Sequence, residues 1–172
     1  WDNAGQTRNN GMNLYEVNPD GTGLNYLYGR HSHDSGEVGT TVQYARPIES
    51  DDGNIIVELR EFESPTLSAV PTKIDVFGHI ESDQRTDGTI GEGQAALISD
   101  IDTTGELSLN GNYGSVFPLY DNTGRLLASW SVCRVRQALA PDAPIETEAN
   151  PPEVCTQAKL DDDLNYEAAP PL

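Results

Sequence analysis

The sequence predicts an all-β protein built from antiparallel sheets. Apolar and polar residues alternate over short runs, turn-forming pairs such as Asp-Gly and Thr-Gly separate these runs, and one pattern of strand, turn and strand occurs twice. No segment shows the periodicity of a long amphipathic helix. A partial β-propeller is the expected architecture, and a β-sandwich is the alternative.

Composition limits the classes of partner. The chain has 172 residues with 28 Asp plus Glu against 10 Lys plus Arg, so its formal charge is −18, and apolar residues make up 36%. This charge repels phosphate backbones and anionic lipid surfaces, which argues against a nucleic-acid or membrane-surface partner. No run of apolar residues is long enough to span a membrane. The chain begins at Trp1, and we expect it to be a processed product or part of a longer polypeptide.

The first predicted strands form a hairpin. Leu14 to Val17 and Leu24 to Tyr28 flank a segment that begins Asn18-Pro19-Asp20-Gly21, which favours a tight turn. Further strands are predicted at Ile55 to Leu59, Ile74 to Ile80, Ala95 to Ile101, Glu106 to Leu109 and Leu126 to Trp130.

An internal repeat supports the propeller. The segment from Pro47 to Leu59 matches the segment from Pro118 to Trp130 without a gap, at an offset of 71 residues. Each copy has a proline, a polar turn with one glycine, and a run rich in aliphatic residues, so both are expected to be equivalent hairpin parts with turns centred on Gly53 and Gly124. The offset exceeds one plain blade, and we place an insertion at Ser82 to Gln94.

The predicted blades cover residues 1–137, and residues 138–172 are predicted to be an acidic, Pro-rich loop that leads to a further blade. This second segment contains six of the 11 prolines and the run Asp161 to Asp163.

The two cysteines, Cys133 and Cys155, are predicted to form a disulfide. Their spacing includes no CxxC pair, which argues against zinc or haem attachment. A disulfide would place the protein in an oxidising compartment, either periplasmic or secreted, and would hold the Cα atoms ~4.4 to 6.8 Å apart. Two unpaired thiols in a reducing compartment are the alternative.

Two kinds of cation site are conceivable. His31, His33 and Asp34 lie close together and could bind a divalent metal, although a histidine that caps a turn explains the same residues. The Asp-rich turns at Asp20, at 51–52 and at 100–102 could bind a structural Ca²⁺, but Asx turns account for them without an ion.

The segment Leu14-Tyr15-Glu16-Val17-Asn18-Pro19-Asp20-Gly21-Thr22-Gly23-Leu24 resembles the outer hairpin of TolB-like β-propeller repeats. The order of this unit, of the two repeated units and of the segment from Ser129 to Val135 is similar to a bacterial family related to the middle domain of the hydrazine synthase alpha subunit. The similarity spans about residues 13–155. It implies two or three blades of a secreted or periplasmic propeller, completed by remaining blades or a second chain. The c-type haem chemistry of the namesake is not implied, because the chain has no CxxCH.

These features favour a binding or scaffold module that docks a protein or carbohydrate partner through its loops. The alternative is the propeller part of a larger envelope enzyme, a hydrolase or a haem-linked oxidoreductase, whose catalytic residues lie outside this chain. No catalytic motif assigns a catalytic residue within it. An incomplete propeller should also expose apolar flanks, which we expect on the strands that contain Leu14, Ile55, Ile74, Leu97 and Leu126.

Overall fold

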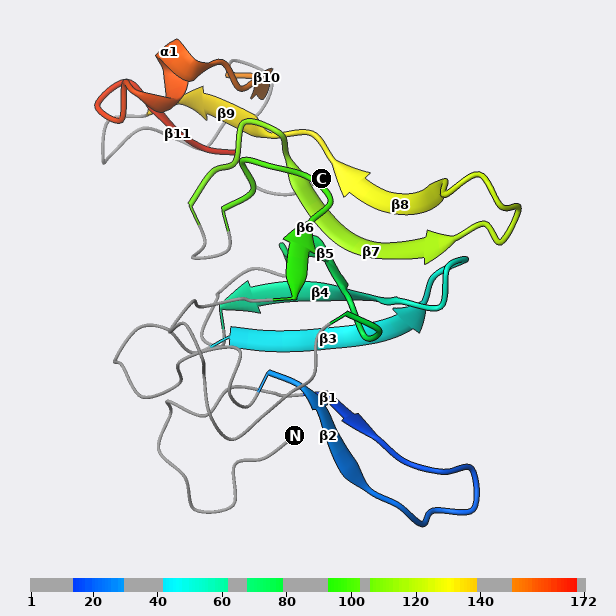
Figure 1. The fold of residues 1–172 in the computed structure, drawn as a ribbon. Coiled ribbons are helices and arrows are strands. Elements are labelled where there is room, and N and C mark those ends of the chain that lie inside the picture. The colour runs from blue at the N-terminus through cyan, green and yellow to red at the C-terminus, as the bar shows by residue number, and fades with distance from the viewer. Residues whose placement is uncertain are drawn as a thin grey trace, which may run out of the picture.

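The computed structural model describes residues 14–29, 42–61, 68–78, 93–102, 106–138 and 150–169. Strands dominate these residues, and the sheets are antiparallel, which confirms the predicted all-β class (Figure 1). The described strands form four separate sheets and no closed ring of blades. The one helix among them, α1 (Gln157–Leu160), has four residues, so no helix in the described part of the chain could cross a membrane.

The largest sheet has four strands in the order β3-β4-β5-β6. Two-stranded sheets precede and follow it in the sequence, β1 with β2 and β7 with β8, and the C-terminal sheet has the order β10-β9-β11. The bounds are β1 (Leu14–Glu16), β2 (Asn25–Tyr28), β3 (Val42–Glu49), β4 (Ile55–Glu61), β5 (Val70–Ile74), β6 (Gln94–Ala96), β7 (Asn112–Pro118), β8 (Leu126–Ser131), β9 (Arg134–Gln137), β10 (Glu153–Val154) and β11 (Tyr166–Ala168).

The main core lies between the first hairpin and the four-stranded sheet. Tyr28 on β2 and Tyr44 on β3 are both buried and meet edge to face, with ring centroids 5.4 Å apart. Both hydroxyls lie within hydrogen-bonding distance of Oε1 of Gln94 on β6, at 3.3 and 3.0 Å. Leu14, Val57 and Ile74 complete the buried cluster. The first hairpin is therefore anchored to the larger sheet by aromatic packing and a shared polar contact.

Several predicted strand limits were wrong because local turns end the strands earlier. β5 ends at Ile74, where the Asp75 carboxylate accepts hydrogen bonds from the backbone N–H groups of Phe77 and Gly78, at 3.1 and 2.7 Å. β6 ends at Ala96, and bends follow it.

The predicted strand from Glu106 to Leu109 is also absent. The buried Ser108 hydroxyl accepts a hydrogen bond from the N–H of Asp102 at 2.5 Å, and its carbonyl accepts one from Gly111. These bonds form a turn that leads into β7.

The C-terminal segment is more regular than the predicted loop. β10, α1 and β11 all lie within residues 150–169, and both strands pair with β9. The expected boundary at residue 137 therefore falls at the end of β9, which belongs to the same sheet as β10 and β11. The apolar side chains of Val135, Leu160 and Tyr166 pack around the disulfide and explain this local order.

Candidate binding surface

The predicted divalent-metal residues His31, His33 and Asp34 lie outside the described residues, as do residues 82–92 of the expected insertion. Within the described ranges, no group of three or more His, Cys, Asp or Glu is placed to hold a metal ion.

In two of the three Asp-rich turns, the carboxylates of Asp20 and Asp52 accept hydrogen bonds from local donors. Oδ1 of Asp20 accepts hydrogen bonds from the backbone N–H and the hydroxyl of Thr22, at 3.0 and 2.7 Å, and these bonds lower the pKa of Asp20. Oδ1 of Asp52 accepts from the Ser50 hydroxyl at 2.6 Å and from the Asn54 N–H at 3.2 Å. Asx turns thus account for both carboxylates without an ion.

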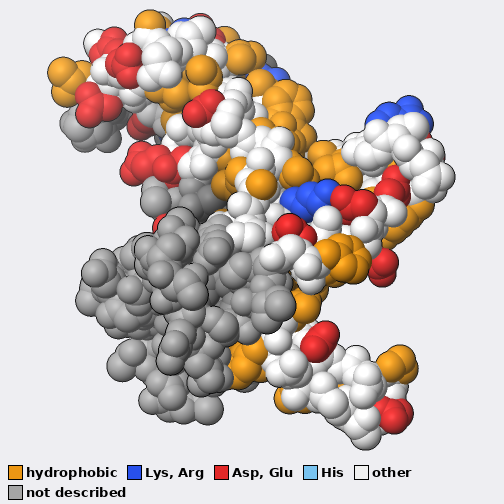
Figure 2. Space-filling view, viewed as in Figure 1, with side chains coloured by type: hydrophobic (Ala, Val, Ile, Leu, Met, Phe, Trp, Pro, Cys, Tyr) orange, Lys and Arg blue, Asp and Glu red, His pale blue; other side chains and the backbone are white. Residues whose placement is uncertain are grey.

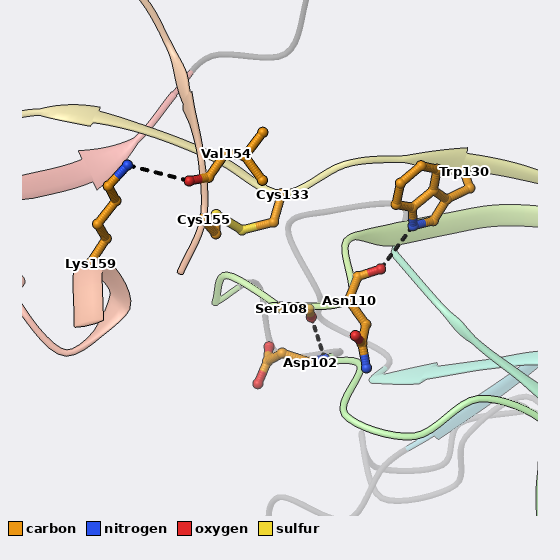
Figure 3. Close-up of a disulfide and its surroundings, with 8 residues drawn as sticks. All are labelled: Asp102, Ser108, Asn110, Trp130, Cys133, Val154, Cys155 and Lys159. Carbon is orange, nitrogen blue, oxygen red and sulfur yellow. Dashed lines mark hydrogen bonds between the residues drawn. A yellow bond between two sulfur atoms is a disulfide. The ribbon is translucent and has the colours of Figure 1, made fainter. Parts of the chain in front are cut away.

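Cys133 and Cys155 form the predicted disulfide, with Cα atoms 5.4 Å apart (Figure 3). Both half-cystines are buried, and the Cys155 N–H donates to the Cys133 carbonyl at 3.0 Å. Nearby, the Lys159 ammonium contacts a Glu153 carboxylate oxygen at 2.6 Å and the Val154 carbonyl at 3.5 Å. The bridge joins the residues beside β9 and β10, and it is compatible with a periplasmic or secreted protein.

The two repeated hairpins are both present. β3 and β4 pair across a loop at residues 50–54, and β7 and β8 pair across a loop at residues 119–125. Gly53 and Gly124 lie in these two loops, where the repeat predicts turns, and both adopt the left-handed conformation, at φ +79° and +70°. The second loop is longer because Pro118 pairs with Leu126, whereas Glu49 pairs with Ile55 in the first copy.

The hairpin of β7 and β8 exposes apolar side chains. Leu127 is 65% exposed, Trp130 is 54% exposed and Phe117 on the neighbouring strand is 50% exposed. The Trp130 ring is held in place because its Nε1–H donates to the Asn110 carbonyl at 2.8 Å (Figure 3). Of the strands expected to expose apolar side chains, β8, which begins at Leu126, does so, and β7 beside it was not among them. The expectation was wrong for Leu14 and Ile74, which lie in the main core, and for Ile55, which packs against it.

One edge of β8 has no strand beside it in the described part of the chain. β8 pairs with β7 alone, and every residue from 127 to 131 is exposed. Figure 1 shows β8 at the periphery of the molecule, with no described strand beyond it. A strand in this position presents backbone donors and acceptors together with apolar side chains.

A cleft of 390 Å³ lies between the loops of the two hairpins. Two hydrogen bonds connect the two hairpins at this end: the Tyr120 hydroxyl donates to the Glu49 carbonyl at 2.8 Å, and the Asn122 N–H donates to Oδ2 of Asp51 at 3.1 Å. Asn122 and Asp51 line the cleft. Both bonds join residues that are 71 positions apart, which is the offset of the repeat. The two loops are thereby held at a fixed separation.

Ion pairs border this cleft. The Lys73 ammonium pairs with the Asp52 carboxylate, and this contact lowers the pKa of Asp52. In the second copy the Asp121 carboxylate pairs with Arg125, and its pKa is lowered by the Thr123 hydroxyl and by Arg125. Figure 2 shows basic and acidic side chains side by side on this face of the molecule. Both basic groups are therefore already matched by carboxylates.

Sequence reasoning did not identify Lys73, Tyr120 or Asn122 as surface-forming residues. The repeat contained part of the signal, because the two bonds between the loops join aligned positions of its two copies. The contribution of Lys73 had no such signal, since β5 has no counterpart beside β8 in the described residues.

Comparisons with protein families, with curated proteins and with solved structures found no match for this chain. The cleft and the exposed hairpin are the features of the described residues that bear on function.

Proposed function

We propose that this chain is a binding or scaffold module of a secreted or periplasmic β-propeller protein, and that it docks a protein partner on the sheet formed by β7 and β8. The observation that carries the proposal is the exposure of β8 at every residue from 127 to 131. β7 packs beside the four-stranded sheet, so the open position lies along β8, and an exposed apolar edge strand favours pairing with another chain.

The chemistry of this sheet favours a protein over a charged polymer. β7 and β8 contain no Asp, Glu, Lys or Arg, although the chain as a whole carries a formal charge of −18. Their exposed side chains include Phe117 and Trp130, and large aromatic residues often dominate the binding energy of protein interfaces.

The first repeat supplies a template for the partner. β4 is flanked by β3 on one side and by β5 on the other, and β5 runs antiparallel to it. We infer that a partner strand lies along β8 as β5 lies along β4. Such a strand would come from a remaining blade or from a second chain. The disulfide supports an oxidising compartment for this assembly.

Site-specific photo-cross-linking tests the proposal. A photoreactive amino acid at position 127 should capture one partner segment in the cells that produce the protein, and mass spectrometry would identify the linked peptide. Position 24 is the control, because Leu24 is 70% exposed but lies outside β7 and β8. Equal capture from both positions, or none from position 127, would contradict the proposal.

A further inference from the structure

The cleft between the repeated loops has the dimensions and the fixed walls of a small-ligand site. Its volume of 390 Å³ lies at the lower end of the ~300 to 1,000 Å³ typical of such sites. The bond from Asn122 to Asp51 joins its two sides, and the bond from Tyr120 to Glu49 holds the same two hairpins together. A ligand would therefore meet a preformed cleft, which reduces the entropy cost of binding.

Apolar groups form part of the cleft lining. Ile56 and Pro118 are buried within the two hairpins, Leu126 is half-buried, and Leu97 is 40% exposed. These side chains provide a surface without hydrogen-bonding groups. The C–H face of a small ligand could pack against this surface.

The polar lining contains both donors and acceptors. Lys73 and Arg125 supply N–H groups, and Asp51 and Asp52 supply carboxylate oxygens. The charges balance locally, because Lys73 pairs with Asp52 and Arg125 pairs with Asp121. An anionic ligand would have to compete with these carboxylates in a chain of charge −18, and a cationic ligand would have to compete with the two basic groups.

We propose that this cleft binds a neutral saccharide, whose C–H face rests on the apolar lining and whose hydroxyl groups exchange hydrogen bonds with the charged lining. A sugar hydroxyl both donates and accepts, so it can bond to an ion pair without breaking it. This site lies at the loop end of the hairpins and does not depend on the docking of a protein along β8.

Binding of three related sugars tests the charge preference. Glucose, glucuronate and glucosamine share a ring but differ in charge, and their dissociation constants would be measured by the shifts of backbone amide NMR signals. A panel with galactose, mannose, N-acetylglucosamine and cellobiose would cover other neutral stereochemistries. We expect at least one neutral sugar to shift amides in both loops, at 50–54 and 119–125, and to bind more tightly than the charged sugars.

Two variants and their matched controls locate the site. Leu97→Trp should fill the cleft and Arg125→Gln should remove donors, and each should weaken binding at least about tenfold, which corresponds to ~1.4 kcal/mol. Leu109→Trp and Arg136→Gln are the controls: Leu109 is similarly exposed, Arg136 also pairs with a carboxylate, that of Glu167, and neither lines the cleft. Thermal unfolding would verify that all four variants fold.

Three results would overturn the inference. These are the absence of loop shifts with every neutral sugar, tighter binding of glucuronate or glucosamine than of any neutral sugar, and equal losses in the cleft variants and their controls. The first result would remove the saccharide site, the second would replace it with an ion site, and the third would place binding elsewhere. None of them would test the protein-docking face, because that face is assayed by cross-linking.

Discussion

The two copies of the repeat form the same hairpin but differ in burial. In the first copy Ile56 is 3% exposed, whereas the aligned Leu127 in the second copy is 65% exposed. Both are aliphatic residues near the start of the second strand of a hairpin. β4 has strands on both sides, while β8 has only β7 beside it among the described strands. The repeated pattern therefore encodes a hairpin, and its neighbours decide which side chains become core.

This difference separates two roles. The hairpin of β3 and β4 belongs to the main hydrophobic core, where Val57 is fully buried against residues of β1, β2, β3 and β5. The hairpin of β7 and β8 contributes one loop to the cleft, and residues 127–131 of its outer strand β8 are exposed. The described residues thus combine a sheet with a buried core and a strand with an exposed edge.

Truncation at the aligned positions 56 and 127 should show the largest contrast. Ile56→Ala removes buried aliphatic atoms and should lower the free energy of unfolding by about 2 to 5 kcal/mol. Leu127→Ala removes exposed atoms and should change it by less than ~0.5 kcal/mol. Urea denaturation of the two variants measures both values. A large loss at position 127 would mean that another segment covers β8 in the isolated chain.

Removal of the disulfide should destabilise the region that follows the hairpin of β7 and β8 more than it destabilises the four-stranded sheet. Replacement of both Cys133 and Cys155 with serine should cost ~3 kcal/mol by the loop-entropy argument, since the bridge spans 22 residues. Hydrogen exchange should accelerate first in β9, β10 and β11, while β4 and β5 keep their protection.

The same experiment has an internal control. The four-stranded sheet has its own buried cluster, which contains neither cysteine. Simultaneous loss of protection in both regions would show that the chain unfolds as one cooperative unit.

The turn glycines provide a smaller contrast. Gly53→Ala and Gly124→Ala each place a side chain at positive φ, which costs roughly 1 to 2 kcal/mol. At Gly53 the added Cβ would also lie 3.0 Å from the Phe77 ring, whereas nothing lies within 4 Å of a Cβ at Gly124. Gly53→Ala should therefore be the more destabilising substitution in thermal unfolding. Equal losses would indicate that the Phe77 ring moves aside freely.

The sequence was sufficient for the local features. The Asp-Gly and Thr-Gly turns, the hairpin strands at Ile55 and Leu126 and the disulfide all depend on neighbouring residues or on a specific residue type. Strand ends were less predictable, because a side chain such as that of Asp75 can end a strand within an apolar run. Ile74 to Ile80 therefore looks like one strand in the sequence but contains a turn.

The surfaces were harder to predict because they depend on tertiary contacts. Leu14 and Leu127 are both aliphatic residues in short strands, yet one is core and the other is exposed. Nothing in either local sequence records which sheet lies beside it. The cleft is a similar case, since Lys73 reaches it from a strand outside the repeated segments.

The smallest predicted effect concerns the pH dependence at Glu58 in the first copy, which aligns with Ser129 in the second. Glu58 is 6% exposed, and burial raises the pKa of its carboxyl above 4.5, although Arg46 at 3.4 Å partly opposes this shift. The folded protein therefore binds this proton more tightly than the unfolded chain does. The resulting stabilisation is present at low pH and is lost as the pH rises through the folded-state pKa.

Glu58→Gln should remove this loss, because glutamine stays neutral. As the pH rises from 4 to 7, the unfolding free energy of Glu58→Gln, measured in urea, should therefore increase relative to that of the unmodified protein. The control compares Ser129→Glu with Ser129→Gln. Position 129 is exposed, so a carboxylate there remains hydrated and the difference between these two variants should vary little with pH. The same pH dependence at both positions would contradict the contrast in burial, because it would mean that Glu58 meets water as freely as a side chain on β8.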